Sequence, residues 1–337
     1  MCPTCNYSCN FSKSLGHVTS LLCLLRVLAC MASSQSALVL KTTLSSHKGV
    51  VNCCAFNSDG EYCMTGGDDR SVKLWNPHRA EPLASTPIKE YTAHNQRVLD
   101  VSIASDNASF ASCGGDRTVF LWDVTSGLVL RRLMGHEQRV NCVRFGPERA
   151  TLVTASYDKT VRCWDLRSKN AAPIQVLTGA ADSVSAIALT EHEIVAGSID
   201  GTVTTFDLRR GKASRDSLGP PVGHVALSGD QNCLLCATLD SRLRLLDKAS
   251  GTVLCEYGGH ENRAFKLACC LSTDDARVLC GSERGDLHVW DLVEGRQLLR
   301  HRAHAGPLVS LACHPKANAI LTASHDGTAK LWTAPGG

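Results

Sequence analysis

A large apolar position that recurs along the chain constrains its fold more than any other feature. Its seven members are Trp75, Trp122, Trp164, Phe206, Leu246, Trp290 and Trp332, at intervals of 47, 42, 42, 40, 44 and 42 residues. A repeat of about 40–45 residues with Gly-His and Trp-Asp is typical of one four-stranded blade of a β-propeller. The sequence therefore predicts an all-β fold of seven blades in one domain.

The unit at residues 135–165 contains the strands that such a blade needs. Apolar residues alternate over 140–145, and two further apolar segments follow at 152–155 and 161–164. Residues 128–133, just before the Gly-His pair, supply a fourth strand. Period-two alternation in short runs of this kind indicates β-strands rather than helices.

The two ends of the repeat array complement each other. Residues 37–44 read as a strand without a blade of its own, whereas the last repeat stops at its third strand, which contains Trp332. Pairing the two would complete the last blade and close the ring. We therefore expect a propeller at 37–334, an N-terminal extension at 1–36, poorly ordered, and a short tail at 335–337.

Four repeats carry the same set of polar residues. The sets, which we call tetrads, are His47/Thr65/Asp69/Trp75, His94/Ser112/Asp116/Trp122, His136/Thr154/Asp158/Trp164 and His304/Thr322/Asp326/Trp332. A hairpin centred just after the Asp would place the hydroxyl residue opposite the Trp, so that all four side chains could form a hydrogen-bonded chain. A catalytic triad has no reason to be copied into four blades, so the tetrads are interpreted as structural.

The remaining repeats lack parts of this set. Blades four and five have no His at the expected place, Ala196 and Cys236 replace the hydroxyl residue, and Phe206 and Leu246 replace the Trp, although Asp200 and Asp240 remain. Blade six keeps His260 and Trp290 but has Cys280 and Arg284 in place of the hydroxyl residue and the Asp. Two extra residues within 261–270 predict a bulge or a longer loop there.

Composition argues against several classes of function. The net charge is +3 with 20% charged residues, which gives no basic footprint for direct nucleic-acid binding. No phosphate loop, HExxH or GxSxG motif is present, so we expect no enzyme activity and no cofactor.

Many of the 18 cysteines, such as Cys54, Cys142, Cys163 and Cys270, occupy apolar strand positions. Buried, reduced thiols indicate the cytoplasm or nucleus.

The first thirty residues do not fit the repeat. Cys2, Cys5 and Cys9 form a CxxCxxxC cluster for which His17 is the nearby fourth candidate ligand of a zinc ion. The alternative is a nonessential extension, because Met31 would begin a compact propeller. The apolar run at 18–30 is too short to span a bilayer, so no membrane association is expected.

Partner binding is predicted at the end of the ring that carries the tetrad turns. The candidates open each first strand or precede each turn Asp: Asp68, Arg97, Arg139, Tyr157, Arg263, Phe265, Glu283 and His325. Arg and aromatic residues are enriched in interface hot spots. The alternative is an ordinary solvated rim.

The chain resembles WD-repeat propellers over residues 37–333 and, within them, the mitogen-activated protein kinase organiser family. The idiosyncratic run TLDSRLRLLDKASGTVLCEYGGHENRAFKLACCLS at 238–272 carries this resemblance, together with VWDLVEG, GDDRSVKLWNP, GGDRTVFLWDVTSG and EIVAGSIDGTV. The resemblance implies a non-catalytic scaffold, monomeric within larger complexes, in the cytoplasm and nucleus. Its implied partners are splicing factors or kinase-module components.

A second interpretation rests on WDLR at residues 164–167, which is echoed by FDLR at residues 206–209. It resembles the motif by which some WD-repeat substrate receptors dock on the adaptor of cullin-type ubiquitin ligases. Arg167 and Arg209 would then contact the adaptor. The alternative is a charged turn with no partner.

Overall fold

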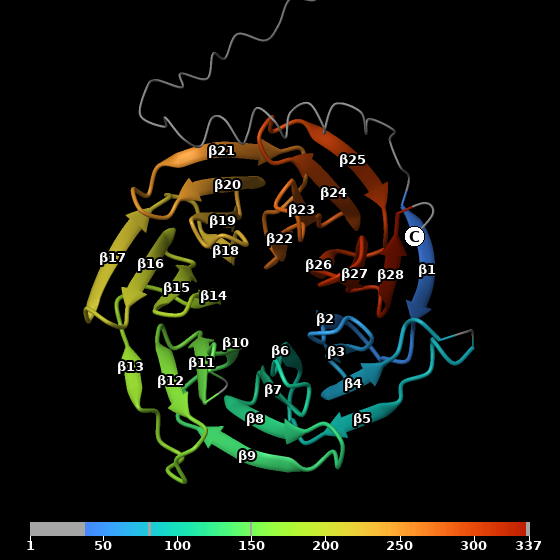
Figure 1. Ribbon diagram of the computed structural model, residues 1–337, viewed down its shortest axis with the longest axis horizontal. Coiled ribbons are helices and arrows are strands. Elements are labelled where there is room, and N and C mark those ends of the chain that lie inside the picture. The colour runs from blue at the N-terminus through green and yellow to red at the C-terminus, as the bar shows by residue number, and fades with distance from the viewer. Residues whose placement is uncertain (1–37, 80–81, 149, 335–337) are drawn as a thin grey trace, which may run out of the picture. The chain divides into compact units, whose positions relative to one another are not determined.

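Seven antiparallel sheets form the described part of the chain. The structure is a computed structural model, and it describes residues 38–79, 82–148 and 150–334. These residues form 28 strands and no helix. They therefore contain no helix that is long and apolar enough to cross a membrane. The sheets are arranged in a ring of seven four-stranded blades (Figure 1), which confirms the predicted fold class. The predictions for residues 1–36 and 335–337 lie outside the described residues.

The strands follow one another from the centre of the ring to its outside within each blade. Blade one comprises β2 (Val51–Phe56), β3 (Cys63–Gly67), β4 (Ser71–Trp75) and β5 (Lys89–Thr92), and blade two β6 (Val98–Ile103), β7 (Ser109–Gly114), β8 (Thr118–Asp123) and β9 (Val129–Met134). Blade three comprises β10 (Val140–Phe145), β11 (Thr151–Ser156), β12 (Val161–Asp165) and β13 (Gln175–Leu177), and blade four β14 (Val184–Leu189), β15 (Glu193–Ser198), β16 (Thr202–Asp207) and β17 (Lys212–Ser217).

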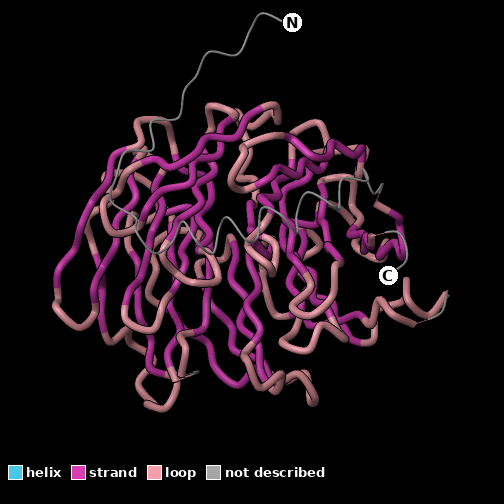
Figure 2. Tube along the Cα trace, turned by 45° about the horizontal axis from the view of Figure 1, so that its top comes forward, coloured by secondary structure: helices cyan, strands magenta, loops and turns pink. Residues whose placement is uncertain are grey.

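Blade five comprises β18 (Val222–Leu227), β19 (Cys233–Thr238), β20 (Arg242–Asp247) and β21 (Val253–Gly258), and blade six β22 (Cys269–Leu271), β23 (Arg277–Gly281), β24 (Asp286–Asp291) and β25 (Gln297–Arg302). Blade seven comprises β26 (Leu308–Cys313), β27 (Ala319–Ser324), β28 (Ala329–Thr333) and β1 (Val39–Leu44). Loops join the strands at two opposite ends of the ring (Figure 2). We call the end at which the innermost strands begin the tetrad end.

The ring closes by pairing the two ends of the repeat array. Strand β1 runs antiparallel to β28, with Leu40 opposite Trp332 and Leu44 opposite Ala329. The N-terminal strand thus supplies the outermost strand of the C-terminal blade, as the sequence predicts. Blade seven therefore has the same four strands as the other six.

The hydrophobic core lies between neighbouring blades. One cluster joins Met64 and Val72 of blade one to Val101, Phe110 and Trp122 of blade two. Strand β11 of blade three is buried at five of its six positions, because neighbouring blades cover both of its faces. Each blade therefore depends on its neighbours for burial.

A β-bulge near the start of the innermost strand explains an irregularity in the alternation. In blade three the register shifts between Val140 and Cys142, so Cys142 and Val143 are both fully buried although they are adjacent. An extra residue in one strand changes which face the following side chains occupy. The same shift occurs in every other blade except blade six.

Blade six departs from the repeat as the two extra residues predict, by a longer loop. Its innermost strand β22 has only three residues, because residues 259–268 form no strand. Ala268 still donates a backbone hydrogen bond to Val309 of blade seven. The predicted bulge or loop is therefore a loop.

Ring closure gives the first testable prediction. A chain that ends at residue 314 loses β27 and β28, so that β1 has no partner and the faces of blades one and six are uncovered. We expect loss of cooperative unfolding, measured by circular dichroism during thermal and urea unfolding.

A chain that begins at Met31 is the control, since it keeps all 28 strands, and we expect its Tm to stay near that of the full chain. A soluble, cooperatively unfolding protein that ends at residue 314 would contradict the closure argument.

Candidate functional site

The tetrad of blade three forms a continuous chain of hydrogen bonds. His136 Nε2 lies 2.7 Å from Thr154 Oγ1, and His136 Nδ1 lies 2.7 Å from Asp158 Oδ2. The indole N–H of Trp164 donates to Thr154 Oγ1 at 2.9 Å. Since an indole can only donate, the hydroxyl accepts this bond and is free to donate to Nε2, which places the imidazole proton on Nδ1, facing Asp158.

The other three predicted tetrads contain the same three hydrogen bonds. They measure 2.7–2.9 Å in the sets of His47, His94 and His304. The four hydroxyl-bearing residues, Thr65, Ser112, Thr154 and Thr322, are all 0% exposed. A nucleophile must reach its substrate, so these buried hydroxyls cannot attack one. Their hydrogen bonds give them a structural role instead.

The predicted cross-strand register was wrong by two residues. Thr154 lies opposite Arg162, and Leu152 lies opposite Trp164, so the tetrad hydroxyl and indole are diagonal neighbours. The turn is centred on Asp158 itself, because Lys159 takes the left-handed conformation with φ of 69°. Diagonal side chains on one face of a sheet are still within reach of a Trp.

The tetrad carboxylates are stabilised in their charged form. Burial alone would raise the pKa of Asp158, but hydrogen bonds from His136 and Thr160 lower it below its ordinary value. The backbone N–H of Glu137 also donates to Asp158, at 3.0 Å. The Asp therefore joins the loop between blades to the turn within the blade.

Arginines replace the missing histidines in blades four and five. Arg215 contacts Asp200 at 2.7 Å, and Arg244 contacts Asp240 at 2.7 Å. Each arginine lies on the same blade as its aspartate. Each of these two aspartates therefore takes part in an ion pair within its own blade.

Blade six replaces the tetrad with a different contact. Glu283 Oε1 accepts hydrogen bonds from three successive backbone N–H groups, those of Arg263, Ala264 and Phe265, at 2.6, 2.6 and 3.1 Å. Glu283 was a candidate for partner binding, and here its carboxylate fixes the loop that presents Phe265. A Glu next to the residue at the Asp position is the sequence signal for this role.

The interior of blade six contains polar atoms without partners. Five buried side-chain atoms make no hydrogen bond to any described residue: both ring nitrogens of His260, both side-chain amide atoms of Asn262 and Nδ1 of His288. The indole of Trp290 donates instead to the carbonyl of Gly258, at 3.1 Å. Unpartnered buried groups cost free energy, so blade six is held less firmly than the four tetrad blades.

Two of the predicted surface residues form an exposed pair that we call the blade-three patch. The guanidinium of Arg139 lies 4.6 Å from the ring centre of Tyr157, and Tyr157 is 40% exposed. No carboxylate among the described residues forms an ion pair with Arg139. The patch therefore offers a free positive charge above an aromatic ring.

Four others gather as a second group, which we call the His325 cluster: Asp68, Arg97, Phe265 and His325. The rings of Phe265 and His325 meet edge to face at 5.0 Å. Burial lowers the pKa of His325, with opposing contributions from the charges of Asp68, which raises it, and Arg97, which lowers it further. Turns and loops of four blades, one, two, six and seven, thus converge at the tetrad end.

The candidate adaptor-docking residues lie at the opposite end of the ring. Arg167 and Arg209 follow the third strands of blades three and four and are exposed. Their backbone N–H groups both donate to the preceding aspartates, Asp165 and Asp207, at 2.9 Å. The structure therefore separates these two arginines from the candidates at the tetrad end.

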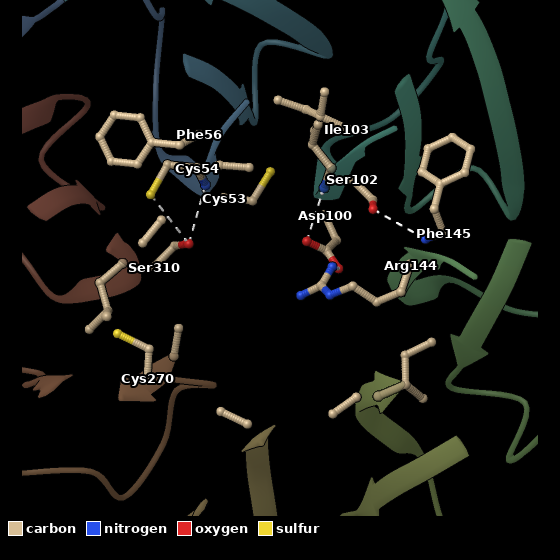
Figure 3. Close-up of a pocket in the computed structure, with 18 of the residues that line it drawn as sticks. Cys53, Cys54, Phe56, Asp100, Ser102, Ile103, Arg144, Phe145, Cys270 and Ser310 are labelled. Atoms are coloured by element: carbon tan, nitrogen blue, oxygen red, sulfur yellow. Dashed lines mark hydrogen bonds and ion pairs between the residues drawn. The ribbon is translucent and has the colours of Figure 1, made fainter. Parts of the chain in front are cut away.

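A central cavity of about 810 Å³ is lined by the innermost strands (Figure 3). Buried Asp100 accepts hydrogen bonds from the backbone N–H of Val143 at 3.0 Å and from the Arg144 guanidinium at 2.5 Å. A charged residue within an otherwise apolar strand is the feature of the sequence that could have predicted this pair.

No group of three or more His, Cys, Asp or Glu side chains in the described ranges is placed to hold a metal ion. The Cys2, Cys5, Cys9 and His17 candidates lie outside those ranges.

Seven blades, ring closure and repeated His–Ser/Thr–Asp–Trp networks define a WD-repeat β-propeller. A family model described as WD domain, G-beta repeat, matches residues 38–76, 251–291 and 295–333. A second, the Nucleolar protein 10-like, N-terminal domain, matches residues 92–262.

Relatives span nearly the whole propeller. The human WD repeat domain-containing protein 83 is 44% identical over 290 residues, 86% of this chain and 90% of the relative. The Xenopus tropicalis protein of that name is 45% identical over 293 residues (87% and 91%), and the Dictyostelium discoideum homolog is 29% identical over 318 (86% and 96%). The chain belongs to the WD repeat domain-containing protein 83 family.

Removing one tetrad hydroxyl tests the structural role of the network. Thr154→Val keeps the shape but leaves the Trp164 N–H and His136 Nε2 without this partner. We expect the free energy of unfolding to fall by about 2 kcal/mol or more in urea unfolding experiments.

Thr151→Val on the same strand is the matched control, since the hydroxyl of Thr151 makes no hydrogen bond with the described residues. Its expected change is within about 0.5 kcal/mol. Equal effects of the two substitutions would contradict the network.

Acid unfolding tests the charged state of the tetrad aspartates. Because the folded pKa of Asp158 is lowered, its carboxylate stabilises the fold above its ordinary pKa of about 4, and this contribution is lost as the pH falls toward the lowered value. The stability advantage of the wild type over Asp158→Asn should therefore begin to shrink as the pH falls from about 5 to 3.

Urea unfolding of both proteins at several pH values in this window measures the difference directly. A difference that stays constant with pH would contradict the assignment.

Proposed function

We propose that this protein is a non-catalytic scaffold that binds partner proteins through the tetrad end of its ring. The observation that carries the proposal is the blade-three patch, in which Arg139 lies over Tyr157 at 4.6 Å and forms no ion pair with a described carboxylate. Arginine and tyrosine dominate binding energy in many interfaces, because they combine a large contact area with directional hydrogen bonds.

The rigidity of the site supports this role. Loops at the tetrad end are tied to turns by the tetrad aspartates and by Glu283, so the surface is preformed. A preformed surface loses little conformational entropy when a partner binds. Relatives named as WD repeat proteins, at 44–45% identity, support the same general role.

The finer proposal follows from the resemblance to the kinase organiser family. We propose that the partners are splicing factors in pre-mRNA splicing complexes and components of mitogen-activated protein kinase modules. The protein would act as a monomer within these complexes, in the cytoplasm and the nucleus. Splicing is the role that we place first.

Charge reversal at the tetrad end tests the proposal. The double variant Arg97→Glu/Arg139→Glu should reduce recovery of partners from nuclear and cytoplasmic extracts by about tenfold or more, measured by affinity purification and quantitative mass spectrometry. Arg296→Glu is the matched control, because Arg296 is exposed in the turn between β24 and β25 at the opposite end.

Thermal unfolding must first establish that both variants fold. Unchanged recovery of every partner by the double variant would exclude this surface as the site.

A second candidate function is a substrate receptor of a cullin-type ubiquitin ligase. The exposure of Arg167, whose side chain is 74% accessible at the opposite end of the ring, favours it. The same purification distinguishes the two functions. Recovery of the cullin adaptor, and its loss in Arg167→Ala alone, would select the ligase function.

A further inference from the structure

Two cysteine sulfurs meet between blades six and seven. Cys270 lies on β22 and Cys313 ends β26, and their Sγ atoms are 3.2 Å apart. The two strands belong to different sheets, so no backbone ladder joins them. Rotation of the side chains need only shorten the separation to about 2.05 Å for a disulfide.

Both cysteines line the central cavity. Cys270 and Cys313 line the cavity and are half-buried, whereas Cys53, Cys54 and Cys269 on the same wall are buried. Figure 3 shows Cys270 on the cavity wall. A small oxidant that enters the cavity therefore comes close to the pair.

The hydrogen bond between the two thiols makes them unequal. The hydrogen bond between them lowers the pKa of Cys313, whereas the same hydrogen bond and burial raise the pKa of Cys270. Burial raises the pKa of Cys54 to about 12 and that of Cys269 well above its ordinary value. Thiolates are the reactive form, so Cys313 is the more nucleophilic thiol on this wall.

The pair lies at the edge of the blade that is held less firmly than the four tetrad blades. Strand β22 has three residues, and blade six contains the buried, unpartnered atoms of His260, Asn262 and His288. Contact between blades six and seven here combines apolar packing around Ala268, Leu308 and Leu311 with backbone hydrogen bonds, among them the one from Ala268 to Val309. A covalent bond at this point would add to the contact between the two blades.

We propose that Cys270 and Cys313 are a redox modification site, which hydrogen peroxide converts into a disulfide that joins blade six to blade seven. The Cys313 thiolate attacks one peroxide oxygen, the O–O bond breaks, and hydroxide leaves, which gives a sulfenic acid. The Cys270 sulfur then attacks the Cys313 sulfur, the S–S bond forms, and water leaves. Two thiols lose two electrons and two protons, and peroxide is reduced to two waters.

The test uses the reduced, folded full chain treated with stoichiometric hydrogen peroxide, then alkylated and digested with trypsin. We expect a cross-linked pair of peptides, 267–277 with 303–316, about 2 Da lighter than the two reduced peptides together. Fragmentation assigns the bond to Cys270 rather than Cys269. Oxidised wild type should also have a higher Tm than reduced wild type.

Three variants separate the steps. Cys313→Ser should abolish both the cross-link and the rise in Tm. Cys270→Ser should leave a sulfenic acid on Cys313 that dimedone captures. Cys54→Ser, which changes a thiol on the same wall, should keep the cross-link.

The wild type alone can overturn the proposal, so a variant that fails to fold does not prevent a decision. A folded wild-type chain in which the two peptides stay separate under peroxide would overturn it. A cross-link that forms only after urea unfolding, or one between Cys313 and Cys54, would do the same.

Discussion

Each blade buries its apolar faces only against its two neighbours, so these sheets are stable only as a closed ring. The cluster that joins Met64 to Trp122 across blades one and two illustrates this dependence. Pairing of β1 with β28 completes blade seven and gives blades one and six a neighbour on both sides. The surface at the tetrad end exists because turns from different blades are held at fixed positions around the ring.

Polar contacts decide how firmly each blade is fixed within that ring. In blade three, buried His136, Thr154 and Trp164 satisfy one another, and Asp158 extends the chain to the loop between blades. Blade six has lost two members of the set, and the buried ring nitrogens of its His260 make no hydrogen bond to any described residue. Glu283 compensates by fixing the loop from outside, which leaves the blade with a well-held surface over a weaker interior.

Much of this structure could be predicted from spacing alone. Seven recurring positions gave the number of blades, and the unmatched strand at 37–44 gave the closure, because both follow from repeat geometry. The tetrads followed from the constant 22 residues between His and Asp. The cross-strand register of the hairpin could not be predicted from this spacing, because the left-handed residue after the Asp, such as Lys159, moves the centre of the turn.

Contacts between blades could not be predicted in the same way. Arg139 and Tyr157, which both belong to blade three, could be predicted from their positions beside the first strand and the turn, and they lie in contact as one patch. The meeting of Phe265 with His325, and of Cys270 with Cys313, depends on how neighbouring blades pack. No repeat pattern in one sequence carries that information.

Hydrogen exchange on the full native chain tests most directly the claim that the polar networks hold the blades. Amides in blade six at 264–271 should exchange at least about tenfold faster than those of β11 in blade three, since opening blade six breaks fewer satisfied contacts. Equal protection of the two segments would contradict the claim. So would fastest exchange at β1 and β28, because the ring would then open first at its closure.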